Sequence, residues 1–155
     1  MPYEVTVKQV PPQHVAEVRR HTTVDAIGSV VGEAFRTLMN SMGRAHERPA
    51  GPPFVVYDRM DLPERRAEIE VCVPVGYRFM GDDDVEVNEI PGGAVASTVH
   101  HGPYDAVGSA YEAVDGWIRD NSLVADGPPR EIYLTDPRET PDPADLMTEI
   151  EFPVR

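Results

Sequence analysis

The sequence predicts an α+β fold built from two similar units, each with the element order strand, strand, helix, strand, strand. Two observations carry this prediction. Three blocks of the first half recur in the same order in the second half, and in both halves the apolar spacing changes from alternation to a helical period and back. Two such units give an eight-stranded antiparallel sheet with two helices on one face.

The repeated blocks define the halves. A repeat of two copies is too short for a solenoid, which needs at least three units. We therefore interpret the chain as a single domain, residues 1–155, with pseudo-repeats at 1–80 and 81–155. The matching blocks are 24–29 (VDAIGS) with 104–109 (YDAVGS), 51–57 (GPPFVVY) with 127–133 (GPPREIY), and 70–75 (EVCVPV) with 149–154 (EIEFPV).

The first half begins with two predicted strands. Val5 and Val7 alternate with polar residues, Val15 and Val18 do so less regularly, and the turn at Pro11-Pro12-Gln13 predicts a hairpin between them. Apolar residues then follow a helical period over 24–42, and Gly43 is a plausible helix stop. After a loop at 44–53, strands are expected at 54–58 and 67–75, joined by a turn around Pro63.

The second half repeats this order. A hairpin of strands 85–90 and 94–100 is expected around Pro91-Gly92-Gly93, then a helix with its inner face at Val107, Ala110, Tyr111, Val114, Trp117 and Ile118. The last strands are expected at 130–135 and 148–154, separated by a loop rich in Pro and Asp.

Two smaller patterns carry structural predictions. The alternations Glu68-Ile69-Glu70 and Glu149-Ile150-Glu151 predict strands with one solvent-facing side. Gly28 and Gly108 stand at equivalent places early in the two helices. Because a glycine inside a helix costs about 1 kcal/mol relative to alanine, we expect close backbone packing at both.

Charge and composition exclude several partners. The formal net charge is −13, so direct binding of nucleic acid or of an anionic membrane is not expected. The run Asp82-Asp83-Asp84 with Glu86 is interpreted as a solvated loop, because it lacks the spacing of a calcium loop. With a single cysteine, no signal peptide and no membrane-length apolar run, the protein is expected to be cytoplasmic.

Glu131 is the main candidate for chemistry. Its repeat equivalent is Val55, and Tyr133, two residues on and therefore on the same strand face, has the equivalent Tyr57. In one interpretation Glu131 points into an apolar site, where a carboxylate meets a cation or acts as an acid or base. In the other interpretation Glu131 is a surface glutamate on an edge strand. The charged Arg130 has the apolar Phe54 as its repeat equivalent, so the two halves do not agree on which side of the strand is buried.

Aromatic and methionine side chains form a second candidate set. Phe35 and Met39 in the first helix, and Tyr111 and Trp117 in the second, fall at core-facing spacing. Core packing explains most of them. The functional alternative is an apolar groove between the helices and over the sheet, where aromatic faces attract cations and methionine adapts to varied ligands.

No cofactor or metal is expected. His100 and His101 have no further histidine or cysteine at ligand spacing, so a zinc site is not predicted, and one of them is expected to cap or pack the following helix start. Cys72 is interpreted as a core residue. Motifs for nucleotide binding and serine hydrolysis are absent from the sequence.

The second half resembles the GyrI-like small-molecule-binding family, which also supplies effector-binding domains of AraC-type and MerR-type multidrug regulators. The matching segments are Pro91-Gly92-Gly93, His101-Gly102-Pro103-Tyr104, Trp117-Ile118, Gly127-Pro128-Pro129 with Glu131-Ile132-Tyr133-Leu134, and Thr148-Glu149-Ile150 with Pro153-Val154. The resemblance implies a duplicated strand–helix–strand–strand fold with a central pocket, in which a glutamate at the position of Glu131 faces lipophilic cations amid aromatics.

Three functions follow from the resemblance. The leading hypothesis is a stand-alone binding domain for amphipathic cations, with Glu131 as charge partner and no DNA binding, since no helix-turn-helix segment is visible. The second is a hydrolase of electrophilic, cyclopropane-type small molecules with Glu131 as acid or base. The third is a gyrase-inhibitor-like domain with a protein partner. The expected ligand-binding residues are Glu131, Tyr133, Tyr57, Val55, Phe35, Met39, Tyr111 and Trp117.

Overall fold

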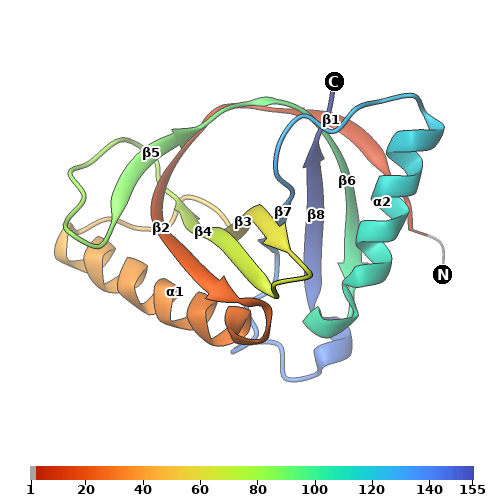
Figure 1. Ribbon diagram of the computed structural model, residues 1–155. Coiled ribbons are helices and arrows are strands. Elements are labelled where there is room, and N and C mark those ends of the chain that lie inside the picture. The colour runs from red at the N-terminus through yellow and green to blue at the C-terminus, as the bar shows by residue number, and fades with distance from the viewer. Residues whose placement is uncertain (1–2) are drawn as a thin grey trace. The chain divides into compact units, whose positions relative to one another are not determined.

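A computed structural model describes residues 3–155 (Figure 1). The fold is α+β with eight strands and two α-helices, and every strand pairing described below is antiparallel, which confirms the predicted class. The elements are β1 (Thr6–Val10), β2 (Gln13–Thr23), α1 (Ile27–Arg44), β3 (Phe54–Asp61), β4 (Arg66–Pro74), β5 (Glu86–Ile90), β6 (Gly93–His101), α2 (Gly108–Asp120), β7 (Arg130–Tyr133) and β8 (Met147–Pro153).

The chain forms two compact units. One consists of Pro12–Pro91, and the other combines Gly92–Arg155 with the residues up to Pro11. We call them the α1 unit and the α2 unit. No helix within residues 3–155 is both long and apolar enough to cross a membrane.

The α2 unit holds strands in the order β1-β6-β8-β7. Helix α2 contacts β6 and β8, and its inner face, Ala110, Val114 and Ile118, packs with Ala96 of β6 and Ile150 of β8 in one buried cluster. Burial of this apolar face stabilises the unit, since a fully buried side chain of this size contributes about 1.5–3 kcal/mol.

The α1 unit holds strands in the order β3-β4-β2-β5. Helix α1 contacts β2 and β4. Along β2, Ala16 and Val18 pair with Val73 and Val71 of β4, and all four are buried. The buried positions of α1 are Val31, Ala34, Leu38, Ser41 and Met42.

Both predicted hairpins at the unit boundaries are wrong. Strand β1 pairs with β6 rather than with β2, and β5 pairs with β2 rather than with β6. One boundary between the two units falls between Pro11 and Pro12. Two consecutive prolines disfavour a tight turn, because the second proline keeps the first out of the helical region that the turn needs. The structural units therefore exchange a strand relative to the pseudo-repeats 1–80 and 81–155.

Equivalent positions of the two repeats adopt matching local structures. Short 3₁₀ segments at Val24–Ala26 and Tyr104–Ala106 lead into α1 and α2. Gly51 lies against Pro74, and Gly127 lies against Pro153 in the same way, so that an added Cβ would meet the proline ring at 3.6 and 3.5 Å. The backbone N–H groups of Ala50 and Asp126 each donate to those prolines' carbonyls at 2.8 Å.

Two smaller expectations fail, one of them in part. A Cβ placed on Gly28 or Gly108 meets nothing within 4 Å, and both residues are exposed at helix starts, so no close backbone packing requires glycine there. The predicted solvent-facing strand side holds for Glu68, whose side chain is 45% exposed, but not for Glu70, Glu149 and Glu151, which are only 13%, 13% and 9% exposed.

Candidate functional site

Glu131 is a buried carboxylate in the α2 unit. It lies on β7 with only 8% of its surface exposed, which excludes the interpretation as a surface glutamate. The hydroxyl of Tyr111 on α2 donates to its Oε2 at 2.6 Å, and the hydroxyl of Tyr133 donates to its Oε1 at 3.3 Å. Both carboxylate oxygens accept, as an ionised carboxylate can. Three of the expected site residues are thus hydrogen-bonded to one another.

Strand register explains where the carboxylate points. Glu131 stands opposite Ile150 of β8, a core residue packed under α2, and Tyr133 stands opposite Thr148. Since residues two apart on a strand share a face, Glu131 and Tyr133 both face the helix side. The equivalent pair in the α1 unit is Val55 opposite Val71, both fully buried. The same position is therefore apolar core in one unit and a carboxylate in the other.

Two further aromatic rings border these residues. Tyr104 contacts Tyr133 edge to face at a centroid distance of 5.5 Å, and Phe152 contacts Tyr111 at 5.8 Å. Burial, followed by the charge of Asp136, raises the pKa of Tyr104 above its ordinary value. Neither Tyr104 nor Phe152 was predicted from the sequence as a site residue. A signal existed, because Tyr104 begins a repeated block and Phe152 follows Ile150 by two residues on the same strand face.

The histidines before α2 are structural neighbours of its start. His100 is buried, and its Nε2 lies 3.0 Å from the Pro103 carbonyl, an atom that can only accept. Its Nδ1 lies 2.8 Å from the Tyr3 hydroxyl. His100 therefore packs and ties the turn into the helix, as the sequence predicted for one of the pair.

The remaining candidates belong partly to the α2 unit and partly to the α1 unit. Trp117 is partly buried against the core cluster of the α2 unit. Phe35 and Met39 on α1, with Val55 and Tyr57 on β3, belong to the α1 unit. Phe35 and Tyr57 are half-buried. Met39 is 47% exposed, so the prediction that Met39 faces the core is wrong. Successive residues of a helix are turned by about 100°, and Leu38 takes the inward position beside it.

Metal-ligating side chains come together where the sequence did not predict it. Glu17, Glu70 and Cys72 of the α1 unit each place one ligand atom within 4.8 Å of the others. The Glu131 carboxylate, by contrast, accepts hydrogen bonds from two tyrosine hydroxyls.

The fold and this arrangement define a class: a duplicated α+β domain in which a buried carboxylate is surrounded by aromatic rings, as in small-molecule-binding proteins. A comparison with protein families matches residues 3–155 to the GyrI-like small molecule binding domain. The chain belongs to this family. A comparison with curated protein sequences gives no match.

Solved structures share the fold. The C-terminal domain of EcmrR is 24% identical with a TM-score of 0.84, and the comparison covers 100% of this chain and 99% of that one. EcmrR in its complex with DNA is also 24% identical with a TM-score of 0.87, and here the chain spans 57% of that protein's length. SAV2435 bound to tetraphenylphosphonium is 16% identical with a TM-score of 0.66, covering 100% of this chain and 94% of that one.

Proposed function

We propose that the protein binds small amphipathic cations at the aromatic site around Glu131, with the Glu131 carboxylate as the charge partner. The observation that carries the proposal is a carboxylate that is 8% exposed and is held by the hydroxyls of two tyrosines, whose rings in turn contact Tyr104 and Phe152. A cation bound beside the carboxylate would be attracted to its negative charge, and ring faces add about 0.5–2 kcal/mol of attraction.

Two hydroxyl donors preorganise the carboxylate. Hydrogen bonds from Tyr111 and Tyr133 fix its orientation without neutralising its charge, so little ordering is left for the ligand to impose. Tetraphenylphosphonium, the ligand of the SAV2435 structure, is a lipophilic cation of the proposed kind. Trp117 remains a proposed contact for the apolar body of the ligand. Ligand contacts of Phe35, Met39 and Tyr57 stay predictions from the sequence, whereas Val55 is fully buried in the core of the α1 unit.

The test is a titration with tetraphenylphosphonium and with triphenylphosphine oxide, a neutral relative, read by calorimetry and by the fluorescence of Trp117, the one tryptophan in the sequence. We expect saturable binding of the cation and weaker binding of the neutral compound. Glu131→Gln keeps the size and removes the charge, and should weaken cation binding by at least about fivefold, equivalent to about 1 kcal/mol.

Asp115→Asn is the matched control, because it removes the same charge from an exposed position on α2 that is paired with Arg119. It should leave the affinity unchanged. Equal weakening by both variants would show only long-range attraction by an acidic protein. Cation binding indifferent to Glu131, or no binding at all, would exclude Glu131 as a charge partner.

A hydrolase is the second candidate. Two structures described as hydrolases from Listeria innocua share the fold at 16% and 17% identity, with TM-scores of 0.69 and 0.67. Glu131 would serve as acid or base toward an electrophilic small molecule of the cyclopropane type, assisted by the Tyr111 or Tyr133 hydroxyl. Formation of a ring-opened product that is lost in Glu131→Gln would favour this function over simple binding.

A further inference from the structure

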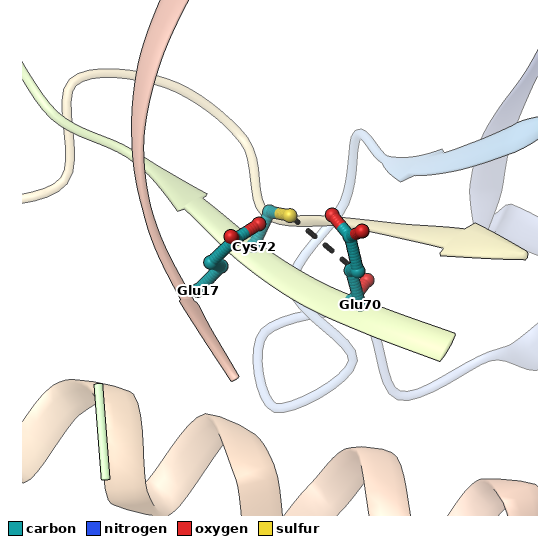
Figure 2. Close-up of side chains that lie close together, drawn as sticks. All are labelled: Glu17, Glu70 and Cys72. Carbon is teal, nitrogen blue, oxygen red and sulfur yellow. Dashed lines mark hydrogen bonds between the residues drawn. The ribbon is translucent and has the colours of Figure 1, made fainter. Parts of the chain in front are cut away.

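A second constellation of side chains lies in the α1 unit, on β2 and β4. Glu17 stands directly opposite Cys72 in the ladder, and Glu70 precedes Cys72 by two residues, so all three share one strand face. Figure 2 shows the Cys72 sulfur between the two carboxylates. One oxygen of each glutamate and the sulfur lie within 4.8 Å of one another, and Glu17 and Cys72 are 1% and 0% exposed.

One atom of this constellation lacks a partner. Oε1 of Glu17 accepts from Nδ2 of Asn88 at 2.6 Å, with Arg19 at 3.4 Å. Oε2 of Glu17 is buried and has no hydrogen-bond donor among the described residues. Buried polar atoms are satisfied in the great majority of cases, and an exception calls for an explanation such as an ion. The unpartnered oxygen belongs to a side chain that contributes to the cluster itself.

At the equivalent position in the α2 unit, basic side chains of the protein compensate the negative charge of the carboxylates. There Lys8 lies 2.5 Å from Glu149 and 3.6 Å from Glu151, and Arg130 approaches Glu151 at 4.0 Å. Two carboxylates thus have two cationic partners.

In the α1 unit negative charge is in excess. Arg19 reaches both Glu17 and Glu70, the latter at 3.7 Å, but its side chain is 61% exposed, and Asp58 adds a third carboxyl beside Glu70. Arg19 is thus the one cationic side chain that the described residues place beside Glu17 and Glu70.

We propose that Glu17, Glu70 and Cys72 bind a divalent transition-metal ion, and that zinc is the ion this ligand set fits best. Thiolate and carboxylate are both common zinc ligands, and the thiolate disfavours magnesium and calcium. The ion would satisfy the open oxygen of Glu17, and its ligands would bind in their deprotonated forms, as metal binding requires. It would link β2 to β4, and Arg19 is exposed enough to withdraw into solvent.

The test uses the full-length protein, stripped with a chelator and titrated with Co²⁺ alone. Because Cys72 is the only cysteine in the sequence, a near-ultraviolet thiolate-to-cobalt absorption band can arise only from Cys72. We expect this band to appear with saturable binding, to be displaced by Zn²⁺, and to be stronger at pH 8 than at pH 6. Cys72→Ser should abolish it, and Glu17→Gln or Glu70→Gln should weaken binding at least tenfold.

Glu149→Gln is the matched control. It changes the repeat equivalent of Glu70 in the α2 unit and should leave cobalt affinity unchanged. The wild-type band identifies the thiolate ligand even if Cys72→Ser folds poorly. Absence of the band at millimolar Co²⁺ would overturn the proposal, as would binding without a thiolate band or a band indifferent to Glu17 and Glu70. In those outcomes the carboxyls share a proton instead of a metal.

Discussion

At the scale of the residue, a single difference separates the two units' equivalent strands. Val55 in β3 and Glu131 in β7 stand opposite core residues in the same register, yet one is apolar and the other carries a carboxylate held by tyrosine hydroxyls. Valine completes a core by burial alone. Glutamate at the same place accepts hydrogen bonds from Tyr111 and Tyr133, and this polar position within apolar surroundings is the physical basis of the proposed cation site.

Asp82 is a second residue whose role was not predicted from the sequence. The acidic run at 82–84 was interpreted as a solvated loop. In the structure Asp82 accepts hydrogen bonds from the Ser41 hydroxyl at 2.6 Å and from Arg44 at 2.8 Å, both in the last turns of α1, and from the backbone N–H groups of Asp84 and Val85. It therefore fastens the loop before β5 to the end of the helix.

These hydrogen bonds, first those from Ser41 and Arg44, hold the pKa of Asp82 well below its ordinary value of 3.8. A lowered folded-state pKa contributes stability that is present above the unfolded-state pKa and is lost as the pH falls toward the folded-state pKa. We expect Asp82→Asn to lower the urea midpoint at pH 6 and to differ less from wild type at pH 3. Asp83→Asn is the control. An equal difference at both pH values would contradict the assignment.

At the scale of the element, the helices contain glycines that no neighbour requires. Gly116 lies in the middle of α2, and a Cβ there would meet only the far end of Arg119 at 3.8 Å, an ordinary contact. Gly127, in the loop before β7, differs because its φ of +151° favours glycine and Pro153 lies 3.5 Å from the position of an added Cβ.

Gly116→Ala should therefore stabilise the protein by about 0.5–1 kcal/mol, since alanine has the higher helix propensity and the unfolded chain loses freedom. Gly127→Ala should destabilise it, because a side chain is strained at that φ. Urea unfolding followed by circular dichroism measures both. Destabilisation by Gly116→Ala would mean that α2 packs more tightly there than the contacts indicate.

At the scale of the whole molecule, the notable feature is the exchanged strand. Strand β1 is the first of the chain but completes the α2 unit, where five of its residues pair with β6. The preceding residues are anchored to the same unit, since Tyr3 is hydrogen-bonded to His100, and Thr98 donates to the Glu4 carbonyl at 2.8 Å. Figure 1 shows β1 and β6 running side by side.

Removal of residues 1–11 should therefore act on the α2 unit. Loss of β1 leaves β6 with an unpaired edge, so backbone amides in Gly93–His101 should exchange hydrogen faster, while those of β2, which keeps β4 and β5, should change little. Hydrogen exchange, read by mass spectrometry on the intact and the shortened chain, distinguishes an effect on β6 from an effect on β2. Faster exchange in β2 rather than β6 would support the hairpin that the sequence predicted.

By itself the sequence determined the duplicated element order, most of the inner-face positions of the helices and the asymmetry between Glu131 and Val55. These depend on local periodicity and on spacing within a repeat, which the chain carries in linear form. Only the tertiary structure decided that β1 joins β6, that Tyr111 reaches Glu131, and that Glu17 stands opposite Cys72. Each joins residues far apart in the chain, and such contacts depend on strand order and register, which local spacing does not specify.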